Sequence, residues 1–187
     1  MEHQSPTDIL EAEHRVIQKM VGAMAVIAEA LEAGREADTE TLRGVVEFMR
    51  IFADKCHHGK EERHLFPLLE QKGVPARGCP LAVLVHEHDR GRTLVGQLSE
   101  AIDAYWRDGV SGRAPVAKSL HALVELYPGH IWKEEYLLFP MTNKILNSEE
   151  QVVLRQRFEA IEEGIGRDVH ERLERMAQRI ETQTFTP

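Results

Sequence analysis

The chain has 187 residues, a length that fits one domain with a short appendage and allows a sizeable hydrophobic core. Its 31 acidic residues outnumber its 23 lysines and arginines, for a net charge of −8, which argues against nucleic acid or an anionic membrane as a partner. No apolar run approaches the roughly 20 residues of a membrane helix, the chain begins with polar residues, and its two cysteines make no disulfide scaffold, so we expect a cytoplasmic protein.

Apolar residues recur at three- and four-residue steps along most of the chain, which predicts helices. The loops between them are short, which favours antiparallel neighbours. The predicted fold is all-α, an antiparallel four-helix bundle with an additional C-terminal helix. The five helices are expected from a cap at Thr7 or Asp8 to Gly34, over about 39–71, over about 80–107, from a turn at 108–115 to about 146, and from a capping box at Ser148 and Gln151 to about 182.

The second half of this bundle repeats the first. Residues 57–67 and 130–140 agree at seven of eleven positions, with an offset of 73. Glu13-His14 in the first helix returns as Glu87-His88 in the third, with an offset of 74. Two separate matches at nearly one offset indicate an internal repeat.

The repeat defines the domain organisation that we predict. A bundle domain at 1–146 consists of two helical hairpins, over 7–73 and 80–146. A C-terminal helix within 147–187 packs on this bundle.

The repeated positions carry residue types that bind metals. Residues four apart lie on one face of an α-helix, so each H-x-x-x-E pair can point the same way. Antiparallel packing can bring both pairs, and a histidine from the partner helix of each hairpin, to one level of the bundle. Such polar groups are costly in a core unless something satisfies them, and imidazole with carboxylate suits Fe, Mn or Zn better than Mg or Ca. The candidate metal ligands are His14, His57, Glu61, His88, His130 and Glu134.

With these residues the chain resembles the hemerythrin-like, or HHE cation-binding, domains. Their pattern is a histidine on the first and third helices and H-x-x-x-E on the second and fourth, and the tail E-E-x-x-L-F-P after each pair is typical of them. The resemblance covers about 7–146. It implies an up-down-up-down bundle with two iron ions, bridged by Glu61, Glu134 and an oxo or hydroxo group, with Mn or Zn as alternative metals.

The chain departs from the oxygen-carrying hemerythrins at two points. Leu84 stands where those proteins have a second histidine on the third helix, and the fourth helix carries H-x-x-x-E instead of H-x-x-x-x-D. One histidine fewer implies a more open metal site, which favours binding of, or reaction with, O₂, peroxide or NO over simple oxygen transport. The expected partner is therefore a small diatomic ligand or peroxide, and the question of catalysis stays open.

Two other functions stay open beside this one. The protein could handle iron or repair iron–sulfur clusters, or it could be a structural bundle with a mononuclear or zinc-filled site. A rival, ferritin-like E-x-x-H pattern at Glu11/His14 and Glu61/His64 is not duplicated, so we favour H-x-x-x-E. The C-terminal helix could form a homodimer or gate the site.

Other residues near the motifs are expected to be structural. His58 and His64 have no partner in the second repeat and are predicted to be surface histidines. Lys60 and Lys133 are predicted to be exposed. His170, in the fifth helix, is predicted to be structural, with the alternative that it reaches groups around the metal site.

Glu62 and Glu135 point about 100° away from the neighbouring Glu61 and Glu134, so they are not expected to be ligands. Tyr127, one turn before His130, is a candidate hydrogen-bond donor beside the site. The Pro128-Gly129 pair is expected to kink the fourth helix, because proline lacks an N–H group and clashes with the preceding turn.

Overall fold

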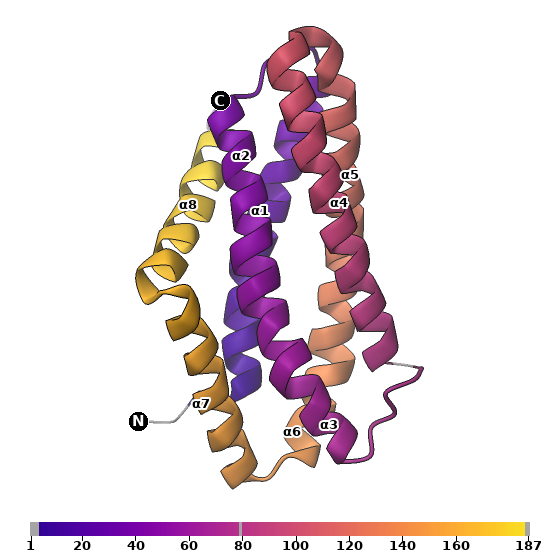
Figure 1. The fold of residues 1–187 in the computed structure, drawn as a ribbon, viewed down its shortest axis with the longest axis vertical. Helices are drawn as coiled ribbons and strands as arrows, with labels where there is room; N and C mark the ends of the chain where they lie inside the picture. Colours follow the sequence, from indigo (N-terminus) through magenta and orange to yellow (C-terminus); the bar gives the residue numbers. More distant parts are fainter. Residues whose placement is uncertain (1–3, 79, 186–187) are drawn as a thin grey trace.

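A computed structural model describes residues 4–78 and 80–185, and its long elements are helices that lie side by side (Figure 1). The helices are α1 (Pro6–Glu32), α2 (Thr39–Phe48), α3 (Phe66–Gln71), α4 (Leu81–Asp108), α5 (Arg113–Lys133), α6 (Phe139–Ile145), α7 (Ser148–Ile165) and α8 (Arg167–Phe185). Three π-helical stretches, η1 (Met49–His58), η2 (Glu61–Leu65) and η4 (Glu134–Leu138), and a 3₁₀ turn, η3 (Gly109–Gly112), lie between them. These ranges contain no β-strand, so the predicted all-α class is confirmed.

Helix ends lie close to their predicted positions, but two caps are shifted. α1 is capped by Ser5, whose side chain accepts from the Asp8 N–H while the Asp8 carboxylate accepts from the Ser5 N–H. Gly34 follows the last turn of α1 with φ +81°, a conformation that favours glycine. The capping box of α7 uses Asn147 with Glu150, one residue before the predicted pair, because asparagine caps as well as serine does.

The second predicted helix occupies the expected 39–71 range, but it is not a regular α-helix. Its hydrogen bonds shift to the wider i→i+5 pattern in η1 and η2 and return to the α pattern at Phe66, directly before Pro67. The fourth predicted helix changes in the same way in η4, before Pro140. Pro128 lies inside the continuous α5, so a kink there stays a prediction, and the irregular turn comes later, at Glu134–Leu138.

The predicted single C-terminal helix is also wrong, because it is divided into α7 and α8. Gly166 separates them with φ +103°, a backbone conformation that other residues rarely adopt. The bend lets both helices follow one side of the bundle (Figure 1). α8 packs against α1 and α2, and α7 packs against α1, η1 and η2.

Two apolar clusters fill the bundle on either side of a polar layer. One holds residues of α1, α2, η1, α4, α5 and α8, among them Ile17, Phe52 and Val95. The other holds Leu10, Leu84 and other residues towards α3, α6 and α7. In the described part of the chain, no helix combines the length and the apolar character needed to cross a membrane.

Candidate metal centre

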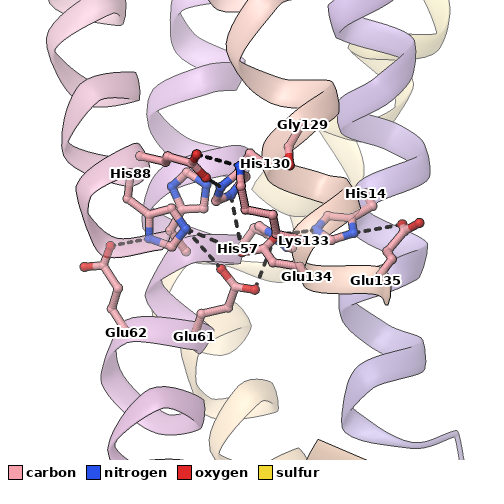
Figure 2. A network of polar contacts seen from close by, with 12 residues as sticks. His14, His57, Glu61, Glu62, His88, Gly129, His130, Lys133, Glu134 and Glu135 are labelled. Carbon is pink, nitrogen blue, oxygen red and sulfur yellow. Dashed lines mark hydrogen bonds and ion pairs between the residues drawn. The ribbon is translucent and has the colours of Figure 1, made fainter. Parts of the chain in front are cut away.

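The six predicted ligands meet in one buried cluster between the two apolar clusters (Figure 2). None of the six is more than 3% exposed. The segments α1, η1, η2, α4, α5 and η4 contribute, in this order, His14, His57, Glu61, His88, His130 and Glu134. The packing expected from the repeat is thus observed, whereas metal binding by these residues stays a prediction.

The carboxylate of Glu134 faces histidines on both of its sides. Its Oε2 atom lies 3.0 Å from His14 Nε2. Its Oε1 atom lies 3.3 Å from His130 Nε2 and 3.6 Å from His88 Nε2. One carboxylate can therefore serve two adjacent groups of imidazoles.

Glu61 is shared in the same way. Its Oε1 atom lies 3.9 Å from His57 Nε2, and its Oε2 atom lies 3.5 Å from His88 Nε2. The cluster thus has two halves, one containing His14 and His57, whose Nε2 atoms are 3.0 Å apart, and one containing His88 and His130. Both carboxylates reach both halves, the geometry that bridging of two cations requires.

Many polar atoms of this cluster have no hydrogen-bond partner. Leaving a buried polar atom unsatisfied costs about 1–3 kcal/mol, so several such atoms pointing at one another indicate a missing binding partner. Their chemistry, imidazole nitrogen and carboxylate oxygen, suits Fe, Mn or Zn. Among the described residues, the unsatisfied atoms of this cluster are Nε2 of His58, His88 and His130 and both carboxylate oxygens of Glu61 and of Glu134.

His58 belongs to this cluster, so its prediction as a surface histidine is wrong. It is 3% exposed, and its ring stacks on that of His88 with the ring centres 3.8 Å apart. It groups with His88 and His130 as a possible set of metal ligands. Adjacent residues of an α-helix point about 100° apart, and the wider π turn of η1 reduces this angle, so His57 and His58 can both face inward.

A comparison with protein families identifies the fold and the motif together. Residues 5–142 match the family model described as the hemerythrin HHE cation binding domain. The chain belongs to this family. The matched range includes every residue of the cluster and ends before α7, so the two C-terminal helices lie outside the range that matches the family.

Similar curated proteins come from mycobacteria. The "Uncharacterized protein Rv1995" of Mycobacterium tuberculosis and the "Uncharacterized protein Mb2018" of Mycobacterium bovis are each 24% identical to this chain over 155 residues. The matched region covers 83% of this chain and 60% of each relative. This chain thus spans about 60% of the length of the relatives that it matches.

Each of the five clustered histidines of this HHE domain donates its other ring nitrogen to a carboxylate. Such partners fix the imidazole orientation and leave Nε2 with a free lone pair. The partners repeat with the chain, since Glu13 and Glu87 are equivalent and so are Glu62 and Glu135. The Nδ1 contacts are His14 to Glu135 (2.9 Å), His57 to Glu13 (3.0 Å), His88 to Glu62 (2.6 Å), His130 to Glu87 (3.1 Å) and His58 to Asp54 (3.4 Å).

Glu13 connects the HHE domain to the C-terminal helices. Its Oε1 atom accepts from Lys60 Nζ at 2.5 Å and from His170 Nε2 at 3.3 Å. Lys60 also donates to Glu162 of α7 and is fully buried, so its predicted exposure is wrong. The equivalent Lys133 bonds Glu87 at 2.6 Å but keeps about a third of its side chain exposed.

Burial governs the pKa values of the cluster. Burial, followed by the charge of Glu134, raises the pKa of Glu61 well above its ordinary value. Burial alone would also raise the pKa of Glu134, but His130, His14 and His88 hold it well below its usual range. Burial lowers the pKa of His57 to about 4, so this imidazole is neutral, as a metal ligand must be.

The other predicted residues lie around the cluster or away from it. Neither Glu11 nor His64 belongs to any group of possible metal ligands in the described ranges, so the E-x-x-H pattern gains no support. The ring of Tyr127 lies edge-on to that of His130, with the centres 6.2 Å apart. His170 follows the alternative prediction, because it reaches a carboxylate that holds His57.

Proposed function

We propose that this HHE domain holds two iron ions in its histidine–carboxylate cluster and binds or reacts with O₂, peroxide or NO. The bundle that carries the cluster is proposed to run up, down, up and down, as expected for this family. The observation that carries the proposal is that Glu61 and Glu134 each lie between the two halves of the cluster. Each has two unsatisfied oxygens directed at different histidines.

The donor set that we propose has seven side chains. One half would be held by His14 and His57 and the other by His58, His88 and His130, with both carboxylates shared. In this proposal His58, from η1, would supply the third histidine of its half, in place of the third-helix histidine that Leu84 replaces. The site is therefore less open than the sequence pattern implies.

Iron bound there would supply coordination positions for a small ligand and electrons for its reduction. The chain's own residues prepare the site for this chemistry. The Nδ1–carboxylate pairs orient the imidazoles. Phe139 stacks on His14 with ring centres 5.5 Å apart and Phe66 stacks on His88 at 5.9 Å, so two equivalent phenyl rings exclude water from one side of the cluster.

The test is metal analysis of protein purified without chelators, combined with optical spectra of the reduced, O₂-exposed and peroxide-exposed protein. We expect two irons per chain and a spectrum that changes with these ligands. Glu61→Gln should reduce the iron content to one or less, because it removes a bridging oxygen. Glu11→Gln, a control in α1 outside the cluster, should keep both irons.

Three outcomes would redirect the proposal. Zinc or a single metal per chain from iron-replete cells would favour a structural role. Iron that a chelator removes within minutes would favour iron handling. Full iron content in Glu61→Gln would contradict the assignment of the bridge.

A further inference from the structure

A cavity lies beside the cluster, between η1 and α4. Its volume is about 210 Å³. Met49, Asp54 and His58 line it from η1, Gly91 and Gly96 from α4, and Tyr127 from α5. A water molecule occupies about 30 Å³ of liquid, so this cavity can admit a molecule larger than a diatomic one. His58 is the lining residue that also belongs to the cluster.

Both long walls of the cavity carry features that cost stability. Gly91 and Gly96 lie inside α4, where each glycine costs about 1 kcal/mol relative to alanine. A Cβ atom at Gly96 would meet nothing within 4 Å, so packing does not require a glycine there. The opposite wall is the π-helical η1, a type of distortion that is frequent at functional sites. The cavity is thus present although the segments on both of its sides are less stable than regular α-helix without glycine would be.

Two buried polar side chains, Tyr127 and His58, line this space. The Tyr127 side chain is 4% exposed, and its hydroxyl lies 3.9 Å from where a Cβ atom on Gly91 would be. The Nε2 atom of His58 has no hydrogen-bond partner in the described part of the chain.

His58 is the most loosely held of the five clustered histidines. Its Nδ1 lies 3.4 Å from Asp54, whereas the other four have carboxylate contacts of 2.6–3.1 Å. Asp54 is also shared with Arg92, whose Nε donates to the same oxygen at 2.9 Å. An imidazole with a weak anchor next to an open space can turn into that space.

We propose that this cavity is the entry route of small ligands, up to the size of a simple hydroperoxide, and that the His58 ring closes its inner end. The proposal rests on the proposed function, because the ligand must have a metal to reach. A molecule would pass between Gly96 and η1, stop at the hydroxyl of Tyr127, and reach the half of the cluster that contains His88 when His58 turns aside. That half would then be held by His88, His130 and the two shared carboxylates.

The test is to fill the route and measure the binding rate of azide. Gly96→Leu places a side chain in open space and should raise the melting temperature, because leucine favours helix more than glycine does. Stopped-flow absorbance of the oxidised, iron-loaded protein should show azide association and dissociation both slowed at least tenfold. The dissociation constant should stay within twofold, because an obstructed route changes both rates equally.

Two further variants complete the experiment, the first as a control and the second as another test of the route. Gly164→Leu makes the same change in α7, where a Cβ atom also meets nothing within 4 Å, and it should leave the azide rates unchanged. Gly91→Ala introduces only ordinary contacts, of 3.7 Å to Leu126 and 3.9 Å to Tyr127, and should slow azide severalfold even if Gly96→Leu fails to fold.

The outcomes separate the two proposals. Iron-loaded wild-type protein that binds no azide would overturn the route together with the proposed ligand chemistry. Azide binding to wild type at a rate that neither Gly96→Leu nor Gly91→Ala alters would overturn the route alone. A changed dissociation constant with an unchanged association rate would also overturn it.

Discussion

At the scale of single residues, the candidate centre depends on how each histidine uses its two nitrogens. The outward Nδ1 donates to a carboxylate, which leaves the inward Nε2 as an electron-pair donor. Four of the five outer carboxylates come from the repeat, whereas Asp54, which contacts His58 and Arg92, does not. His58 therefore differs from the other four histidines because it has no equivalent in the repeat and because its Nδ1–carboxylate distance is longer.

The contribution of His58 can be tested by the rate of iron release. His58→Ala should release iron to a ferrous chelator at least tenfold faster than wild type, because one donor is lost while His88 and His130 remain. His86→Ala, an exposed histidine of α4, is the matched control and should release iron at the wild-type rate. Equal release rates for both variants would contradict a ligand role for His58.

The sequence predicted six of the seven clustered side chains and missed the seventh for a physical reason. The repeat identifies residues with an equivalent in the other half, and the equivalent of His58 is Ile131. An α-helical model also turns His58 away from His57. The π-helical hydrogen bonding of η1 reduces the angle between the two rings, and it has no sequence signal separate from that of an α-helix.

At the scale of elements, α7 and α8 cover one of the two repeated hairpins and so give equivalent residues of the two hairpins different surroundings. Lys60 and Lys133 hold equivalent glutamates, Glu13 and Glu87, and the sequence predicted both lysines to be exposed. α7 covers Lys60 and supplies Glu162, whereas Lys133 stays partly in solvent. The repeat could not reveal this difference, because the covering helices lie outside it.

This difference predicts unequal effects of one substitution at two equivalent sites. Burial would lower the pKa of Lys60, but Glu13 and Glu162 raise it above its ordinary value, so Lys60 is charged. Its removal takes the only lysine contact from the buried Glu13 carboxylate among the described residues. Lys60→Met should cost about 3–5 kcal/mol of unfolding free energy. Lys133→Met should cost less than about 1 kcal/mol, because its ion pair is partly exposed.

Urea unfolding of the two variants, in metal-free protein, measures these values. A cost for Lys60→Met as small as that for Lys133→Met would show that α7 and α8 do not depend on this contact. The comparison also bears on the C-terminal helices, because Lys60 is a direct link between them and the partner of His57.

At the scale of the whole molecule, the predictable features were those set by periodicity and repetition. Helical spacing predicted the all-α class and the 39–71 range, and the duplicated motif predicted which side chains would meet. The break at Gly166 was not predicted, because single glycines inside a helical pattern, such as Gly164 in α7, are tolerated. The angle that it introduces depends on packing against α1 and α2, which local sequence does not encode.

The cluster joins segments from the whole bundle, so metal loading should stabilise the entire molecule. Iron at about a thousand times its dissociation constant adds roughly 4 kcal/mol, which corresponds to about 10 °C in melting temperature for a chain of this size. Calorimetry at pH 7.5 should show this difference in melting temperature between iron-loaded and metal-free protein, which is called the gap below. In Glu61→Gln, which removes a bridging oxygen, the gap should largely disappear.

The gap in melting temperature between iron-loaded and metal-free protein should narrow as the pH falls from 7.5 to 5. Burial would lower the pKa values of His14 and His88, but contacts with Glu134 and with Glu135 or Glu62 raise both above their ordinary value of 6.5. Their protonation stabilises the metal-free fold below pH 6.5, and this contribution is lost as the pH rises through the raised pKa values. Iron must displace these protons, so its advantage grows with pH. A gap that stays constant over this range would mean that the two imidazoles are not ligands.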